Sequence, residues 1–194
     1  LKLLQRELPE QVLAGWTNRQ ELFERAGAFI EKALPGQKNV SAAFLAVDRN
    51  RDGVVQYEML NAETTERLDF RPSRTLLTQL RIDDPVPGDV HIWTSREDDR
   101  VFRADSLNEE IDWVAAVPVA PYDDSGEVHR DRDKNRPVYL YVETRDATEN
   151  SAAVFLPFLR LIAALIASLL SARDQQRIQD RMATFFSPNL RRLM

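Results

Sequence analysis

The residues with the most suggestive chemistry form an acidic turn, Asp48-Arg-Asn-Arg-Asp-Gly53. Its two aspartates, its asparagine and its glycine match the first half of an EF-hand calcium loop. The twelfth position of such a loop must supply a bidentate acid, and here it is Met59, with Glu58 one place too early. The flanking sequences are typical of strands and not of helices. We therefore expect a β-turn here, and no metal site.

Two histidines are the next candidates for catalysis or metal binding. His91 lies in a short predicted strand beside Trp93, where it could face a pocket, and His129 lies in a charged loop. A lone histidine is more often a structural hydrogen-bonding residue than a ligand. The chain also has no cysteine, which excludes disulfides, thiolate metal sites and cysteine nucleophiles.

No complete catalytic set is present in the sequence. There is no glycine-rich phosphate loop, no His-Glu-x-x-His motif and no Gly-x-Ser-x-Gly motif. Acidic pairs such as Asp83-Asp84 and Asp123-Asp124 fall in predicted loops, without the apolar surroundings that separate the pKa values of paired carboxylates. We expect no catalytic residue and no enzymatic activity in this chain, and no cofactor can be assigned.

Composition indicates a soluble globular protein. The 194 residues are 43% hydrophobic and 29% charged, which suits one domain with extensions. The net charge of −5, with acids and bases mixed along the chain, gives no basic footprint for nucleic acid. The start lacks the pattern of a signal peptide, so we expect a cytoplasmic location. The first residue is Leu1 and the end is a charged helical pattern, which we interpret as a piece of a longer protein.

The elements that must position these residues predict an α+β fold with an antiparallel sheet. An amphipathic helix at 19–34 begins with Thr17 or Asn18 as N-cap and Glu21 as the reciprocal partner. Apolar β-formers predict two hairpins, 40–47 with 54–62 and 113–119 with 137–144. A short helix is expected at 74–80, a short strand at 89–94 and a helical centre at 106–111. The helix at 19–34 and the last helix are the only elements large enough to cover one face of the sheet.

The last helix is predicted at 151–187, which corresponds to roughly 55 Å. Its apolar run at 152–170 is long enough to suggest a membrane span, but Pro157 and Arg160 lie within it. We favour a buried core helix and expect no membrane span. A body of this size is too small to cover the whole helix, so its second half should project as a connector.

At this point the chain resembles a GAF domain, over residues 19–172. The resemblance depends on the order and spacing of the first helix, the hairpin at Asp52-Gly53, the long last helix and several short runs. These runs are Ser41-Ala-Ala-Phe-Leu-Ala-Val-Asp48, Arg71-Pro-Ser-Arg-Thr-Leu-Leu77, Ala115-Ala-Val-Pro-Val119 and Val138-Tyr-Leu-Tyr-Val-Glu143. The resemblance implies a GAF/PAS-like antiparallel sheet covered on one face by the N- and C-terminal helices.

The two ends of the chain resemble parts of cyclase proteins. The run Met182-Ala-Thr-Phe-Phe-Ser-Pro-Asn-Leu-Arg-Arg192 is similar to the junction that leads into a class III adenylate/guanylate cyclase catalytic domain. The run Leu3-Leu-Gln-Arg-Glu-Leu-Pro9 is similar to the linker that follows a forkhead-associated domain. The resemblance implies a linker helix at 1–18, a GAF domain at 19–172 and a signalling helix at 173–194 before an output domain.

The implied function is regulation of that output domain. A GAF module of this kind relays ligand or dimer state through its last helix, and the alternative is a ligand-free dimerisation scaffold. The Asn-Lys…Phe…Asp-Glu set of cyclic-nucleotide-binding members has no match here, and the cysteine of bilin-binding members and of the methionine-sulfoxide reductases of this fold is absent. A small ligand, if one binds, would meet a pocket lined by Phe70, Leu77, His91, Trp93 and Trp113.

We also expect a homodimer through the terminal helices. Apolar residues in the last helix recur at steps of three and four, with a polar gap at 173–177, which fits a parallel helix pair. Part of this set must face the sheet instead. The set comprises Ile162, Leu165, Leu169, Ala172 and, in the signalling helix itself, Ile178, Met182 and Phe185.

Overall fold

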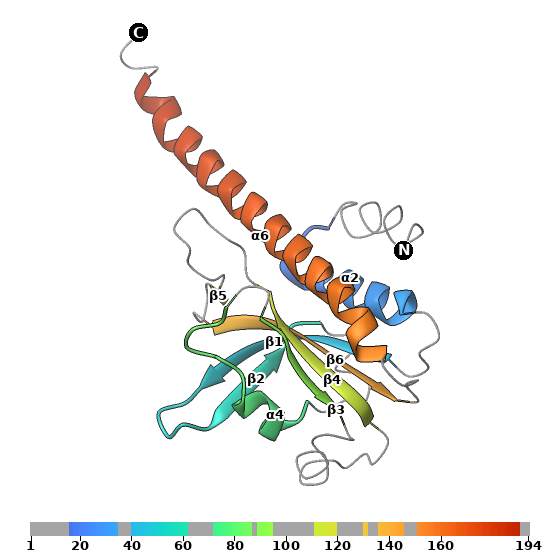
Figure 1. Ribbon diagram of the computed structural model, residues 1–194. Helices are drawn as coiled ribbons and strands as arrows, with labels where there is room; N and C mark the ends of the chain where they lie inside the picture. Colours follow the sequence, from blue (N-terminus) through green and yellow to red (C-terminus); the bar gives the residue numbers. More distant parts are fainter. Residues whose placement is uncertain are drawn as a thin grey trace.

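The computed structural model describes residues 16–34, 40–61, 72–86, 89–94, 111–119, 130–131, 136–145 and 151–190. Several predicted features lie wholly or partly outside these residues, namely the linker helix at 1–18 as far as position 15, the pocket residue Phe70, the helical centre at 106–111 as far as position 110, His129 and the signalling helix at 173–194 beyond position 190. Within the described residues the fold is α+β, as predicted (Figure 1). The elements in chain order are α2 (Arg19–Ala33), β1 (Val40–Arg49), β2 (Val55–Met59), α4 (Arg74–Thr78), β3 (His91–Thr94), β4 (Ile111–Pro118), β5 (Arg130–Asp131), β6 (Arg136–Arg145) and α6 (Ser151–Leu190).

One antiparallel sheet contains the strands in the order β2-β1-β6-β4-β3, and the short β5 pairs with β6. The two predicted hairpins are confirmed, because β1 pairs with β2 and β4 pairs with β6 in antiparallel register. β1 also pairs with β6, so Phe44 lies opposite Leu140. β1, β6 and β4 thus form the centre of the sheet, which explains why their sequences are almost continuously apolar.

The sheet separates two apolar clusters, because successive side chains of a strand point to opposite faces. On the helix face, even-numbered residues of β1 and β6 and odd-numbered residues of β4 pack with α2 and α6. On the opposite face, the alternate residues of the same strands pack with the leucines of and after α4, at positions 76, 77 and 80. Figure 1 shows α2 and α6 on one side of the sheet and α4 on the other. The protein therefore has three layers.

α2 lies very close to β1, and a glycine makes this approach feasible. A Cβ atom at Gly27 would lie 3.1 Å from Asn61 Nδ2 and 3.4 Å from the backbone oxygen of Ala42. Asn61 is buried and follows the end of β2. Its side chain accepts a hydrogen bond from the Phe44 N–H at 2.9 Å and donates one to the Ala42 oxygen at 3.0 Å. Asn61 thereby takes the place of a further strand residue beside β1.

α6 has two parts that differ in environment. Its first part presents a stripe of buried side chains to the helix face of the sheet, at Leu159, Ile162, Ala163, Ile166, Ala167 and Leu170. Beyond Asp174, every described side chain up to position 183 is exposed. In Figure 1 this second part leaves the body as a rod, and the helix continues to Leu190. The predicted long helix is therefore confirmed.

Candidate functional site

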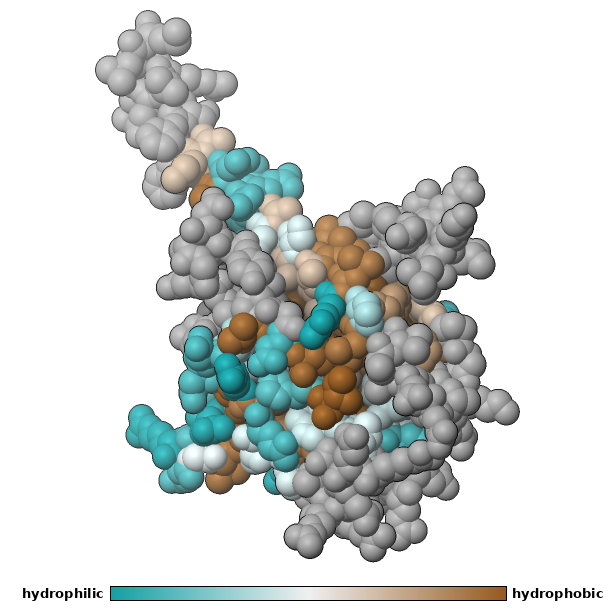
Figure 2. Space-filling view, in the orientation of Figure 1, coloured by the Kyte–Doolittle hydropathy of each residue, from teal (hydrophilic) through white to brown (hydrophobic). Residues whose placement is uncertain are grey.

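The projecting part of α6 carries two of the three residues predicted for the signalling helix. Ile178 is 44% exposed and Met182 is 57% exposed, although both side chains are large and apolar. The side chain of Phe185 lies outside the described residues. Figure 2 shows apolar side chains concentrated where α6 meets the body, and a mixture of hydrophilic and apolar side chains along the projecting part. Exposed apolar side chains on a projecting helix are the usual mark of a helix–helix contact.

An outer stripe continues this surface back along the helix to the body. We define the outer stripe by positions that recur at alternating steps of three and four, as in a heptad repeat. Its exposed apolar members are Leu161, which is 55% exposed, and the two residues already described. The small or polar residues between them allow two helices to approach closely. In order, the stripe is Leu161, Ala164, Ser168, Ser171, Gln175, Ile178 and Met182.

The structure divides the apolar set that the sequence suggested for helix pairing. Ile162 is only 1% exposed and packs into the helix-face cluster, and Leu165 and Leu169 are half-buried against the same cluster. These residues stabilise the body and do not lie on the outer stripe. Leu161 takes the outward position that the sequence had not assigned. Counting heptads backwards from Met182 would have identified it.

The start of α2 and the exit of α6 are joined by a group that we call the polar clamp. It comprises Trp16, Thr17, Arg19, Arg173 and Asp174. The Arg173 guanidinium lies 4.3 Å from the centroid of the Trp16 ring and donates a hydrogen bond to the backbone oxygen of Thr17. Arg19 forms an ion pair with Asp174 at 3.5 Å. The sequence offered no signal for this contact, since Thr17 and Arg173 are 156 positions apart.

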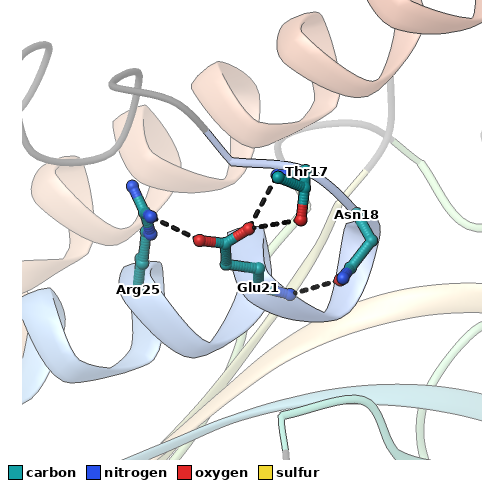
Figure 3. Close-up of polar contacts among 4 residues, drawn as sticks. All are labelled: Thr17, Asn18, Glu21 and Arg25. Carbon is teal, nitrogen blue, oxygen red and sulfur yellow. Dashed lines mark hydrogen bonds and ion pairs between the residues drawn. The ribbon is translucent and has the colours of Figure 1, made fainter.

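Capping interactions hold the α2 side of the polar clamp in place (Figure 3). The side-chain oxygen of Asn18 accepts a hydrogen bond from the Glu21 N–H at 2.9 Å, so Asn18 is the N-cap. The Glu21 carboxylate accepts bonds from the Thr17 N–H at 2.6 Å and from its hydroxyl at 2.9 Å. Those bonds from Thr17, together with Arg25, lower the pKa of Glu21. The predicted reciprocal cap is present, with Glu21 reaching one residue before the N-cap.

The residues predicted to line a ligand pocket are divided between the two faces of the sheet. Leu77 and Trp93 lie on the α4 face and are buried within its apolar cluster. His91 lies beside Trp93, with the rings stacked at a centroid distance of 5.9 Å. Trp113 belongs to the helix-face cluster. It is adjacent in β4 to Val114, which pairs with Trp93, so the two tryptophans point to opposite faces of the sheet. The structure therefore brings together Leu77, His91 and Trp93, and places Trp113 on the other side of the sheet.

Polar side chains on the α4 face hold the segment after α4 against the sheet. Trp93 Nε1 donates to Gln79 Oε1 at 2.7 Å, and the Tyr139 hydroxyl donates to the Arg81 oxygen at 2.9 Å. Burial, followed by the nearby charge of Asp89, raises the pKa of Tyr139 well above its usual value. Asp89 lies 3.8 Å from His91 Nε2. These hydrogen bonds hold protein segments together. The Trp93 Nε1 and the Tyr139 hydroxyl therefore already donate to protein oxygens.

The acidic turn is a β-hairpin turn in which the Asn50 side chain forms hydrogen bonds with the backbone. Asn50 Oδ1 accepts hydrogen bonds from the Asp52 N–H at 3.0 Å and from the Val54 N–H at 2.8 Å. Gly53 adopts a φ of 79°, which a side chain would disfavour. Among the described residues, no group of three or more histidines and acids is close enough to hold a metal ion.

The first part of α6 also fits the dimensions of a membrane span. The segment Phe155–Ala183 is long and apolar enough to cross a membrane, judged by its length and composition alone. One such helix is weak evidence, because core helices of soluble proteins have the same properties. In this chain the segment contributes Leu159, Ile162 and Ile166 to the cluster between the helices and the sheet.

Comparison with known proteins does not assign the chain to a family. No protein-family model matches the chain, and neither does any curated protein or solved structure. The geometry of α6 and of the two sheet faces is therefore the basis for a functional proposal.

Proposed function

We propose that this chain is a regulatory module that passes its dimer state along α6 to an output domain. The observation that carries the proposal is the division of α6 into a buried part and a projecting part with an apolar outer stripe. A helix fixed in a core at one end can transmit a change in its pairing to whatever follows its other end. The module itself has no catalytic role in this proposal, binds no nucleic acid and works in the cytoplasm.

The type of module that we propose is GAF-like and precedes a class III adenylate/guanylate cyclase domain. An antiparallel sheet with two helices on one face and a short helix on the other supports the GAF-like part of the proposal. The run from Met182 to Arg192 supports the cyclase part. In this arrangement the segment before α2 and the segment after α6 both connect the module to other domains.

Packing on the α4 face supports a ligand-free module better than a ligand-sensing one. Leu76, Leu77 and Leu80 cover strand residues on this face, and Trp93 is 4% exposed beneath its neighbours. Leu77 and Trp93, two of the residues predicted to line a pocket, are thus packed against other protein side chains. We propose a scaffold that signals through dimerisation and needs no small molecule to fold.

A ligand-sensing version is the second candidate, and one observation favours it. Glu143 is buried on the α4 face, in a sheet row that runs from Trp93 through Val114 to Glu143 and Ser41. Carboxylates are rarely buried in protein interiors, and binding sites often contain one. Native mass spectrometry of the purified chain would reveal a bound small molecule. A mass equal to that of the bare chain, or of its dimer, would count against this version.

Sedimentation velocity over a range of concentrations tests the dimer. We expect the chain to be a dimer, and the double substitution Ile178→Glu, Met182→Glu to convert it to a monomer, because four glutamates would meet in the apolar seam. The matched control is Gln176→Glu, Ala183→Glu, which places the same charges on exposed positions of the other side of the helix. A monomeric parent chain at high concentration, or a control that dissociates equally, would overturn the proposal.

A further inference from the structure

The polar clamp lies at the point where the chain both enters and leaves the body. Trp16 and Thr17 precede the N-cap of α2, and Asp174 is the last α6 residue whose side chain is buried within the part of the helix up to position 183. Trp16 also packs against the helix-face cluster, so its ring lies between the core and the Arg173 guanidinium. The clamp therefore ties the segment that enters the body to the segment that leaves it.

The contacts of the clamp depend on the orientation of α6, and one of its charged groups is shielded from water. Asp174 is only 7% exposed, and a carboxylate in that environment depends on its partner cation. Arg173 makes two different contacts, a cation–π contact with a ring and a hydrogen bond to a backbone oxygen. Both contacts require one particular rotation of α6 about its axis. A helix rotated by one residue would lose all of them.

The position of the clamp also lets it control the direction of the rest of α6. From Asp174 to Leu190 the helix extends by about 24 Å at 1.5 Å per residue, and side chains 175–183 are exposed. A small change of direction at the clamp becomes a large displacement at the far end. The apolar contacts before position 170 fix the root of the helix but do not fix the direction of the part beyond it.

We propose that the polar clamp is a coupling device that sets the direction of the projecting part of α6 and responds to the segment before Trp16. A pull or twist on that segment displaces Trp16 and Thr17, releases Arg173 and frees the rod. The signal passes from the entry to the exit of the body without crossing the sheet. This inference goes beyond the proposed relay of dimer state, since it concerns one subunit and holds whether or not an output domain follows.

Distance measurements between two spin labels test how the rod is held. The chain has no cysteine, so Gln56→Cys in β2 and Ala183→Cys in the rod give unique labelling sites at exposed positions. Labelled full chain is diluted with unlabelled chain so that only distances within one subunit are measured. We expect a narrow distance distribution in the labelled chain with no further substitution. The distribution should shift and broaden after Arg173→Gln, Asp174→Asn or Trp16→Ala.

Two matched controls separate coupling from a general loss of stability. Arg177→Gln removes the same charge one turn further along α6, at an exposed position, and should leave the distribution narrow. Trp16→Phe retains an aromatic face for Arg173 and should restore the narrow distribution that Trp16→Ala loses. Circular dichroism of each variant checks that the body is still folded.

Hydrogen exchange tests the passage of the signal from the entry segment to α6. We expect Trp16→Ala to make the amides around Arg173 exchange about tenfold faster, with unchanged exchange in β1 and β6. Distributions as narrow in Trp16→Ala and Asp174→Asn as in Arg177→Gln would overturn the coupling device. Faster exchange throughout the sheet would overturn it too, since Trp16 would then be a core residue without a specific effect on α6. Both measurements are made in the Ile178→Glu, Met182→Glu background, so that helix pairing does not hold the rod.

Discussion

At the scale of single residues, the start of α2 shows how a half-buried carboxylate can have a structural role. Glu21 accepts two hydrogen bonds from Thr17 and one from Arg25, and all of these favour its ionised form. Its pKa is therefore lowered, first by the backbone N–H of Thr17. A lowered pKa in the folded protein means that the contribution of Glu21 to stability is fully present above its pKa in the unfolded chain. That contribution is lost as the pH falls through the lower pKa in the folded protein.

This sign gives a testable pH dependence. The substitution Glu21→Gln should lower the free energy of unfolding at neutral pH, and the difference from the parent chain should vanish in acid, where Glu21 is protonated in both states. Urea denaturation at neutral and acid pH measures it. Glu24→Gln is the control, because Glu24 is on the same helix and contacts only Gln20 among the described hydrogen bonds. A difference that persists unchanged in acid would contradict this role of Glu21.

At the scale of the element, α6 is governed by which of its faces meets the sheet. Leu159 and Leu161 have the same side chain and are two positions apart, yet one is fully buried and the other is 55% exposed. Two residues correspond to about 200° around an α-helix, so neighbouring leucines can lie on opposite sides. The same helix therefore packs one face against the core and leaves another face exposed.

The two leucines form a matched pair for stability measurements. Leu159→Ala should lower the free energy of unfolding by about 2–5 kcal/mol, because it leaves a cavity in the helix-face cluster. Leu161→Ala should change it by only about 0.5 kcal/mol or less. Both are best measured by urea denaturation in the Ile178→Glu, Met182→Glu background, which removes any contribution from helix pairing. Equal losses for the two substitutions would show that α6 is not oriented as described.

At the scale of the whole molecule, the protein combines a three-layer body with a rod that begins inside it. The body is stabilised by two apolar clusters on either side of one sheet, and the rod beyond Asp174 contributes no buried side chain up to position 183. Stability of the body and integrity of the rod should therefore be separable. A signalling connector needs this property, since the rod must change without unfolding the body.

Breaking the rod tests this separation. Ile178→Pro removes a backbone hydrogen bond and introduces a clash within the helix, at a cost of about 3 kcal/mol or more. We expect loss of helical signal and of regulated output in the protein that contains the chain, while exchange of β1 and β6 amides remains as slow as before. Ile178→Ala, which retains the helix, is the control. Regulated output that survived Ile178→Pro would exclude transmission through α6.

Much of the architecture follows from patterns between residues close in sequence. The period of the apolar residues identified α2, the two hairpins and the length of α6, and the order of these elements predicted an α+β fold with an antiparallel sheet. The sequence limited the N-cap of α2 to Thr17 or Asn18, with Glu21 as its partner, and the structure shows Asn18 in this role. Such features depend on interactions a few positions apart, which a sequence displays directly.

Tertiary packing decided which face of α6 meets the sheet and on which face of the sheet each tryptophan lies. The apolar run at 152–170 has apolar residues all round the helix, so apolar character alone did not show that Ile162 faces the sheet and Leu161 faces outwards. Trp113 and Trp93 are equally apolar, and only the strand register places them on opposite faces. The polar clamp depends on a contact between residues 156 positions apart, at which distance no local pattern exists. The sequence by itself determined that a long helix leaves this protein, and the packed structure decided which face it shows and which residues hold it at the exit.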